Sequence, residues 1–200
     1  MNKKLYLMII TSLGIALFFV IGKFLSIPTP IPNFALFLQY AILVVFSFYF
    51  GPIVGLGVGF LGHFLIDLLS GYGIWMSWIV SSGVFGLLTG LASKIINKWV
   101  NPFKFSRMVF FVLATILAGA ICWMVIAPLG DILIFNQSYN VVFLEGIVAF
   151  GTNLSSALLI GLPLVYSLKR APIKHTIINK DNTRVVKKEV PVVEEGKTSE

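Results

Sequence analysis

Long apolar stretches, separated by short polar or glycine- and proline-containing segments, dominate the first 168 residues of the chain. A helix needs about 20 apolar residues to cross a hydrocarbon core of about 30 Å. Six stretches come close enough to this length to predict transmembrane helices: residues 5–25, 34–50, 53–69, 74–92, 108–127 and 142–166. The pair Gly51-Pro52 predicts a tight reversal between the second and third stretches. The expected fold class is therefore all-α, a polytopic membrane protein with six transmembrane helices.

The charge distribution supports this interpretation. Thirteen of the 23 charged residues lie from Lys169 onward, which leaves seven basic and three acidic residues in the first 168. So few charges cannot keep a globular surface hydrated, which excludes a soluble enzyme, a nucleic-acid-binding domain and a disulfide scaffold. We therefore divide the chain into a membrane domain, residues 1–168, and a charged tail, residues 169–200, that we expect to be disordered.

Basic residues predict how the domain is oriented in the membrane. They form three clusters, which precede the first stretch, separate the fourth from the fifth and follow the sixth: Lys3 and Lys4; Lys94, Lys98, Lys104 and Arg107; Lys169 and Arg170. Cytoplasmic loops carry an excess of Lys and Arg, and all three clusters fall inside if both termini are cytoplasmic. We expect a multi-pass protein of the cell membrane, with Asp131 in an outer loop.

Polar and large aromatic side chains gather in the outer half of the predicted bundle. Ionisable groups within a membrane span are costly and usually mark function. With the predicted orientation, the outer half receives His63, Asp67, Trp75, Trp78, Trp123, Glu145 and Asn153. A channel would need polar lining along its whole length. The pattern instead indicates a substrate pocket that opens outward and is closed below.

Helical spacing groups these residues into faces. Gly51, Gly55, Gly59, His63 and Asp67 recur every four residues and form one stripe, along which another helix can approach closely. Ser82 shares a face with Trp75 and Trp78, and Asn153 shares one with Glu145. Asn33 ends a proline-rich outer loop that could cover the pocket. Asn33 and Ser82 thus join the seven residues above as candidate substrate-binding residues.

Each candidate also has a purely structural interpretation. The tryptophans could anchor the helices at the membrane interface. His63 and Asp67 could pair with each other, Asn153 could form an interhelical hydrogen bond, and Glu145 could face water. The spacing does not decide between these interpretations. It predicts no catalytic residues, no metal ligands and no cofactor, because no hydrolase or metalloprotease motif is present and the second histidine, His175, lies in the tail.

The run 46–90, and above all its pattern G-H-x-x-x-D-x-x-x-G-Y-G from Gly62 to Gly73, resembles the substrate-binding S components of energy-coupling factor (ECF) transporters, of the riboflavin type. The resemblance covers residues 5–168. It implies capture of a vitamin outside the cell, followed by association with a transmembrane coupling protein and two ATPase subunits. It also implies that a small-xxx-small motif of the first helix, here Ser12 and Ala16, docks on the coupling protein.

The substrate is less constrained than the family. A flavin ring could stack on the tryptophans and use Asn153, Ser82 or Asn33 for hydrogen bonds. The same groups would serve thiamine or its hydroxymethylpyrimidine precursor. Two other classes of function stay open, a gradient-driven carrier that works alone and an intramembrane enzyme that uses His63, Asp67 and Glu145; we expect no enzymatic activity.

Overall fold

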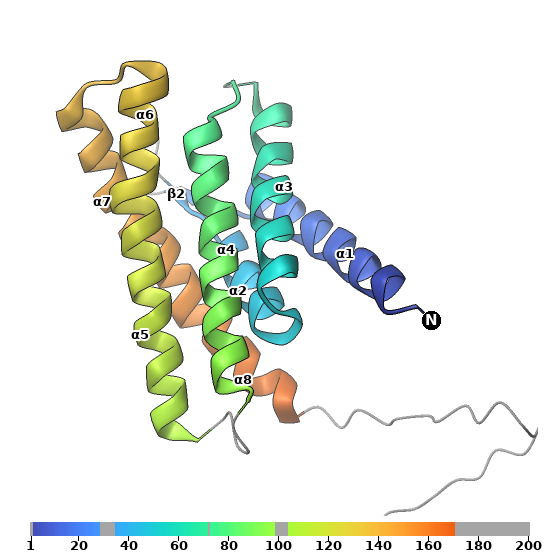
Figure 1. The fold of residues 1–200 in the computed structure, drawn as a ribbon. Coiled ribbons are helices and arrows are strands. Elements are labelled where there is room, and N and C mark those ends of the chain that lie inside the picture. The colour runs from blue at the N-terminus through green and yellow to red at the C-terminus, as the bar shows by residue number, and fades with distance from the viewer. Residues whose placement is uncertain (1, 29–34, 72, 99–103, 171–200) are drawn as a thin grey trace, which may run out of the picture. The chain divides into compact units, whose positions relative to one another are not determined.

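A computed structural model of the chain describes residues 2–28, 35–71, 73–98 and 104–170, and these are almost entirely helical (Figure 1). In chain order the helices are α1 (Lys3–Phe24), α2 (Gln39–Phe50), α3 (Pro52–Ser70), α4 (Met76–Ile96), α5 (Phe105–Ile121), α6 (Ala127–Phe135), α7 (Tyr139–Ser156) and α8 (Leu162–Arg170). Two short π-helices, η1 (Cys122–Ile126) and η2 (Ala157–Gly161), join α5 to α6 and α7 to α8. A two-residue antiparallel ladder pairs β1 (Ile27–Pro28) with β2 (Ala35–Leu36).

Five of the resulting helical segments are long and apolar enough to cross a membrane. They are Lys3–Phe24, Pro52–Ser70, Met76–Ile96, Phe105–Phe135 and Tyr139–Leu168. The sixth, α2, has 12 residues and extends about 18 Å at 1.5 Å per residue. It begins at Gln39 rather than at residue 34. The predicted tail lies outside the described residues from 171 onward, so its disorder stays a prediction.

Glycines make the two reversals around α3. Gly51 ends α2 with φ of 87°, and Pro52 starts α3 in its first turn, which confirms the predicted reversal. At the other end of α3, Gly71 and Gly73 have φ of 77° and 94°. These left-handed conformations are strained for residues with a side chain. The two glycines of the G-Y-G sequence are therefore needed to turn the chain from α3 into α4.

The closest helix pair of the bundle is α3 with α4. A Cβ atom on Gly55 would overlap the backbone carbonyl of Gly86, and one on Gly59 would overlap the carbonyl of Ser82. Residues without side chains let the two backbones approach to this distance. The predicted glycine stripe therefore faces α4, and it brings His63 and Asp67 toward the same neighbour.

Both π-helices end two residues before a proline, Pro128 after η1 and Pro163 after η2. Proline has no N–H group, and in a regular α-helix its ring collides with the carbonyl four residues earlier. A wider π-turn just before the proline absorbs this conflict and lets the helix continue. The fifth helix therefore extends to Phe135 rather than ending at residue 127, and the expectation that Asp131 lies in a loop is wrong.

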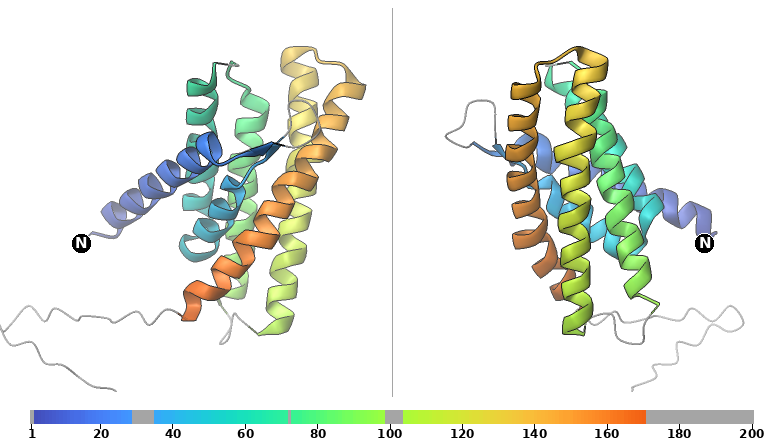
Figure 2. Two further views of the ribbon diagram at one scale, coloured as in Figure 1. Left: turned by 180° about the vertical axis from the view of Figure 1, so that it is seen from behind. Right: turned by 60° about the vertical axis from the view of Figure 1, so that its left-hand side comes forward.

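The helices lie in a bundle whose two ends differ (Figures 1 and 2). We call the end with the α3–α4 and α6–α7 connections the upper end, as drawn in Figure 1, and the opposite one the lower end. Helix α1 crosses the bundle obliquely and buries only Gly14, Phe18 and Gly22. The core lies between α2, α4 and η1, where Tyr40, Phe85 and Trp123 are fully or almost fully buried.

Candidate functional site

A chain of hydrogen bonds links α2, α3 and α4 through Ser82. The Ser82 hydroxyl oxygen lies 2.6 Å from Nδ1 of His63 on α3 and 2.9 Å from the phenol oxygen of Tyr40 on α2. Ser82 is fully buried, and the glycine contacts of α3 and α4 hold the His63 backbone close to it. The structure thus brings together His63 and Ser82, two candidates from different predicted stripes, and adds Tyr40, which was not among the candidates.

Asp67 extends this chain toward the upper end. One carboxylate oxygen lies 3.5 Å from Nε2 of His63, one helical turn away, and the other accepts the backbone N–H of Trp75 at 3.0 Å. Trp75 is the residue just before α4, so Asp67 fixes the start of that helix. The structure therefore shows the mutual pairing of His63 and Asp67, and their contact with a substrate stays a prediction.

Asp131 belongs to the buried polar groups of the upper half, although the sequence predicted it in a loop. Its side chain is only 1% exposed. One carboxylate oxygen accepts the indole N–H of Trp78 at 2.7 Å, and the other accepts the hydroxyl of Ser77. The available signal was that the apolar stretch continues past Asp131 to Phe135, but the predicted fifth span ended at residue 127. Trp78 is thus bound through its ring nitrogen to α6.

The remaining upper-end candidates lie at the edge of the bundle. Trp75 is half-buried, and its ring lies 4.7 Å from that of Phe135 at the end of α6, measured between centroids. Glu145 is half-buried on α7. Asn33 lies outside the described residues, so its place in a loop that covers the pocket stays a prediction. Among the described residues, no group of three His, Cys, Asp or Glu side chains is arranged to hold a metal ion.

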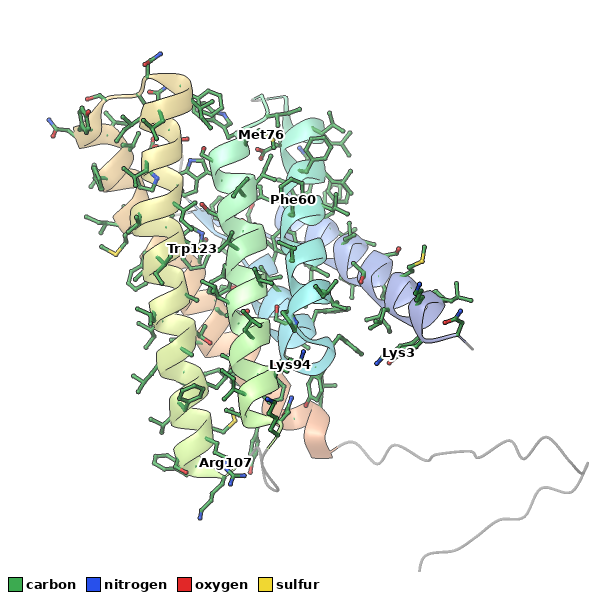
Figure 3. All side chains as sticks on the ribbon, viewed as in Figure 1. Lys3, Phe60, Met76, Lys94, Arg107 and Trp123 are labelled. Atoms are coloured by element: carbon green, nitrogen blue, oxygen red, sulfur yellow. The ribbon has the colours of Figure 1, made fainter. Side chains whose placement is uncertain are left out.

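An aromatic cluster occupies the middle of the bundle, where Figure 3 places Trp123. The Trp123 and Tyr40 rings meet edge to face, with centroids 5.0 Å apart and planes at 81°, and Trp123 lies 4.6 Å from Phe85. Phe18 of α1 packs against the other side of Tyr40 at 5.7 Å. Such T-shaped pairs are favourable beyond their buried area. Trp123 is therefore an interior residue and not an interfacial anchor.

Five buried side-chain polar atoms of the described residues have no hydrogen-bond partner: Nε1 of Trp123, Oδ1 of Asn153, Oγ of Ser156, Oε1 of Gln39 and Oγ of Ser47. Leaving a buried donor or acceptor unpaired costs about 1–3 kcal/mol, and no water in a hydrocarbon core replaces the missing bond. Trp123 supplies a donor and Asn153 an acceptor. A ligand with the complementary groups would remove this cost.

Ser12 and Ala16 lie far from these residues along the chain, on α1. Both are exposed, and they sit between Met8 and Val20 on one face of the helix, at a spacing of four residues. Two small side chains therefore lie between larger exposed ones on this face. The structure is compatible with a docking face here and shows no partner.

Comparisons with known proteins find a matching family and similar proteins for almost all of the described part of the chain. The family model described as "ECF-type riboflavin transporter, S component" matches residues 2–170. Among similar proteins are the UPF0397 proteins of Streptococcus pneumoniae strains CGSP14 and P1031, each 41% identical over 169 residues, which covers 84% of this chain and 92% of the relative. No solved structure matches the chain significantly.

Proposed function

The chain belongs to the ECF-type riboflavin transporter S component family, and from this membership we propose that it captures riboflavin or a related flavin at its upper end for an ECF-type importer. The family is one of transporter subunits and not of enzymes. Together with the five long apolar helices, membership makes the protein a multi-pass membrane protein. The substrate, the partners and the placement in the cell membrane are parts of the proposal.

The observation that carries the proposal is a pair of buried, unpaired atoms, a donor on Trp123 of the aromatic cluster and an acceptor on Asn153 of α7. Nε1 of Trp123 and Oδ1 of Asn153 are buried and have no hydrogen-bond partner within the protein. The edge of a flavin ring system offers carbonyl oxygens and an N–H group, and its flat face suits the rings of Trp123 and Tyr40. A bound flavin would thus satisfy two atoms that the protein leaves unsatisfied.

The distribution of charge supports the proposed orientation. The acidic residues of the membrane domain, Asp67, Asp131 and Glu145, lie toward the upper end, whereas Lys94 and Arg107 lie at the lower end (Figure 3). An excess of Lys and Arg marks the cytoplasmic side. We infer that the upper end faces outward, that α2 completes a set of six spans, and that both termini and the tail are cytoplasmic.

The proposed partners are a transmembrane coupling protein and two ATPase subunits. The exposed small residues Ser12 and Ala16 on α1 are the proposed docking positions, because small side chains allow close contact between helices in a membrane. Energy for import would then come from these partners. A carrier that works alone would need no such contact, and uptake into vesicles that lack ATPase subunits separates the two cases.

The first experiment identifies the ligand directly. The protein is purified in detergent and denatured, and any released molecule is identified by its absorption spectrum and its mass. Released flavin, or tight binding of added riboflavin, supports the proposal. Release or binding of thiamine or hydroxymethylpyrimidine would keep the S-component function and replace the substrate. A protein that binds none of the three would contradict vitamin capture at this site.

A further inference from the structure

A groove lies on the outer surface of the lower half of the bundle, between α5 and the continuous helix α7–η2–α8. Its volume is about 580 Å³, within the range of roughly 300–1,000 Å³ that is typical of small-molecule sites. Its wall is apolar and is formed by Phe105, Met108, Leu158, Leu162, Pro163 and Tyr166. We call it the α5–α8 groove. It faces the outside of the bundle, where Phe105 is 83% exposed, and so it opens toward lipid.

The path of the helices explains why this groove exists. The continuous helix α7–η2–α8 runs obliquely across the bundle, whereas α5–α6 is nearly upright, so the two separate toward the lower end (Figure 2). Leu158 lies in the π-turn η2, and Pro163 follows it. The backbone irregularity therefore belongs to the wall of the groove. Ordinary side-chain motion would not close a gap that the helix axes themselves create.

Two cationic residues lie next to groove-wall residues at the lower end of α5. Lys104 immediately precedes α5 and is exposed, and it lies one helical turn before Met108 of the groove wall. Arg107 is in the first turn of the same helix, at the lower end in Figure 3. The acidic residues of the described ranges, Asp67, Asp131 and Glu145, all lie toward the opposite end. The potential at this end is thus positive, next to an apolar trough.

We propose that the α5–α8 groove is a binding site for one anionic phospholipid. An acyl chain lies along the apolar wall, and the phosphate lies beside Lys104 and Arg107. An apolar trough with cations at one end is complementary to a lipid with a negative headgroup, and a zwitterionic lipid would gain less from the same site. This inference rests on the orientation given under the proposed function, because the lower end of α5 must lie at the level of the headgroups.

The test compares two lipids that have identical acyl chains. The full chain is placed in nanodiscs of phosphatidylglycerol and phosphatidylcholine in equal amounts, and the lipids retained after release are counted by native mass spectrometry. One basic residue at a membrane surface contributes about fivefold to the binding of anionic lipid. We therefore expect one retained phosphatidylglycerol, preferred by at least about tenfold, and loss of most of this preference in Lys104→Gln/Arg107→Gln.

Matched variants separate the site from general charge. Lys94→Gln/Lys98→Gln removes the same charge from the end of α4 and should leave the preference within about twofold of the original chain. Met108→Trp fills the groove and should lower the number of retained lipids, whereas Leu117→Trp, in a smaller groove of about 210 Å³ between α4 and α5, should not. Arg107 also interacts within the protein, so its substitution can affect folding. If the double variant unfolds, the single variant Lys104→Gln tests the lipid preference instead.

Vitamin binding is measured on the same samples. Equal retention of the two lipids, or an equal loss of preference in the α4 double variant, would overturn the lipid site even if vitamin binding is intact. A protein that binds no vitamin but retains one phosphatidylglycerol would contradict the proposed function and support the lipid site. The two failures are therefore distinguishable.

Discussion

The indole nitrogen of Trp78 lies 2.7 Å from a carboxylate oxygen of Asp131, which joins the first turn of α4 to α6. The hydroxyl of Ser77 donates to the other oxygen of the same carboxylate. Asp131 thus receives two donors from neighbouring residues of one helix. This contact holds the upper parts of α4 and α6 together, next to the proposed vitamin site.

We expect Asp131→Ala to destabilise the protein by about 2–4 kcal/mol, because the buried donors of Trp78 and Ser77 would lose their common acceptor. Asp131→Asn retains one acceptor oxygen and should lose less than half as much. Thermal unfolding in detergent measures both. Equal losses in the two variants would show that the negative charge, and not the acceptor, is what matters.

The contact of α3 with α4 predicts a sharp difference between two glycines. In Gly59→Ala the new methyl group meets the backbone carbonyl of Ser82, so the helices must separate, at a cost of about 3 kcal/mol or more. In Gly151→Ala a Cβ atom meets nothing within 4 Å, and the helix should gain roughly 0.5–1 kcal/mol. Unfolding temperatures of the two variants check this. A stable Gly59→Ala protein would mean that the two helices are further apart than described.

Asn153→Leu should separate ligand binding from stability. Because Oδ1 of Asn153 has no hydrogen-bond partner within the protein, its removal should leave the unfolding temperature unchanged or higher. The affinity for the vitamin should fall by about 10- to 100-fold, since the ligand loses a hydrogen bond in a dry site. Equilibrium binding and unfolding are measured on the same preparation.

Thr115→Val is the control for this variant. It also removes a buried polar group, but its hydroxyl donates to the carbonyl of Phe111 within the same helix at 2.8 Å. Vitamin binding should be unaffected. If Asn153→Leu binds the vitamin as tightly as the original chain, Asn153 is not part of the site.

The hydrogen-bonded side chains of His63, Ser82 and Tyr40 should contribute to stability as one coupled unit. Ser82→Ala and Tyr40→Phe each remove one end of the same 2.9 Å hydrogen bond, so their effects on stability should be non-additive by about 1 kcal/mol. A double-mutant cycle measures this coupling. Ser82→Ala with Thr89→Val, about 10 Å further along α4, should be additive within about 0.5 kcal/mol. An additive first cycle would show that the bond does not form in the membrane.

Ser12→Leu/Ala16→Leu tests the proposed docking face. The substitutions replace the small side chains of this face by large ones, so ATP-dependent uptake by the assembled importer should fall by about tenfold or more, while vitamin binding to the isolated protein stays within about twofold. Gly151→Leu places an equally large side chain on an exposed face of α7 and should not alter uptake. Normal uptake in the α1 variant would move the docking face elsewhere.

The sequence predicted features that rest on strong local constraints. The four-residue repeat of Gly55 and Gly59 requires a neighbouring helix, and the structure places α4 there. Gly51 and Pro52 leave the backbone few alternatives to a reversal. These signals are steric, so they can be recognised in a short window of residues.

Contacts between distant segments could not be predicted in the same way. Tyr40 sits in an apolar run and resembles an interfacial anchor until Ser82, 42 residues away, is placed beside it. Pro128 signals the end of a helix in most contexts, and only the π-turn η1 shows that this helix continues as far as Asp131. The pairing of Asp131 with Trp78 follows from that continuation.

The π-turns also set the rotational phase of everything that follows them. Each residue of an α-helix advances about 100° around the axis, so a turn with one extra residue shifts all later side chains by that angle relative to a regular helix. Deleting one residue from η1 would restore a regular turn and remove this shift at the same time, so Asp131 would keep its position beside Trp78, whereas a deletion in a regular turn of α5 would rotate Asp131 away from Trp78. Loss of a single residue should therefore be tolerated better within Cys122–Ile126 than within the regular turns of α5.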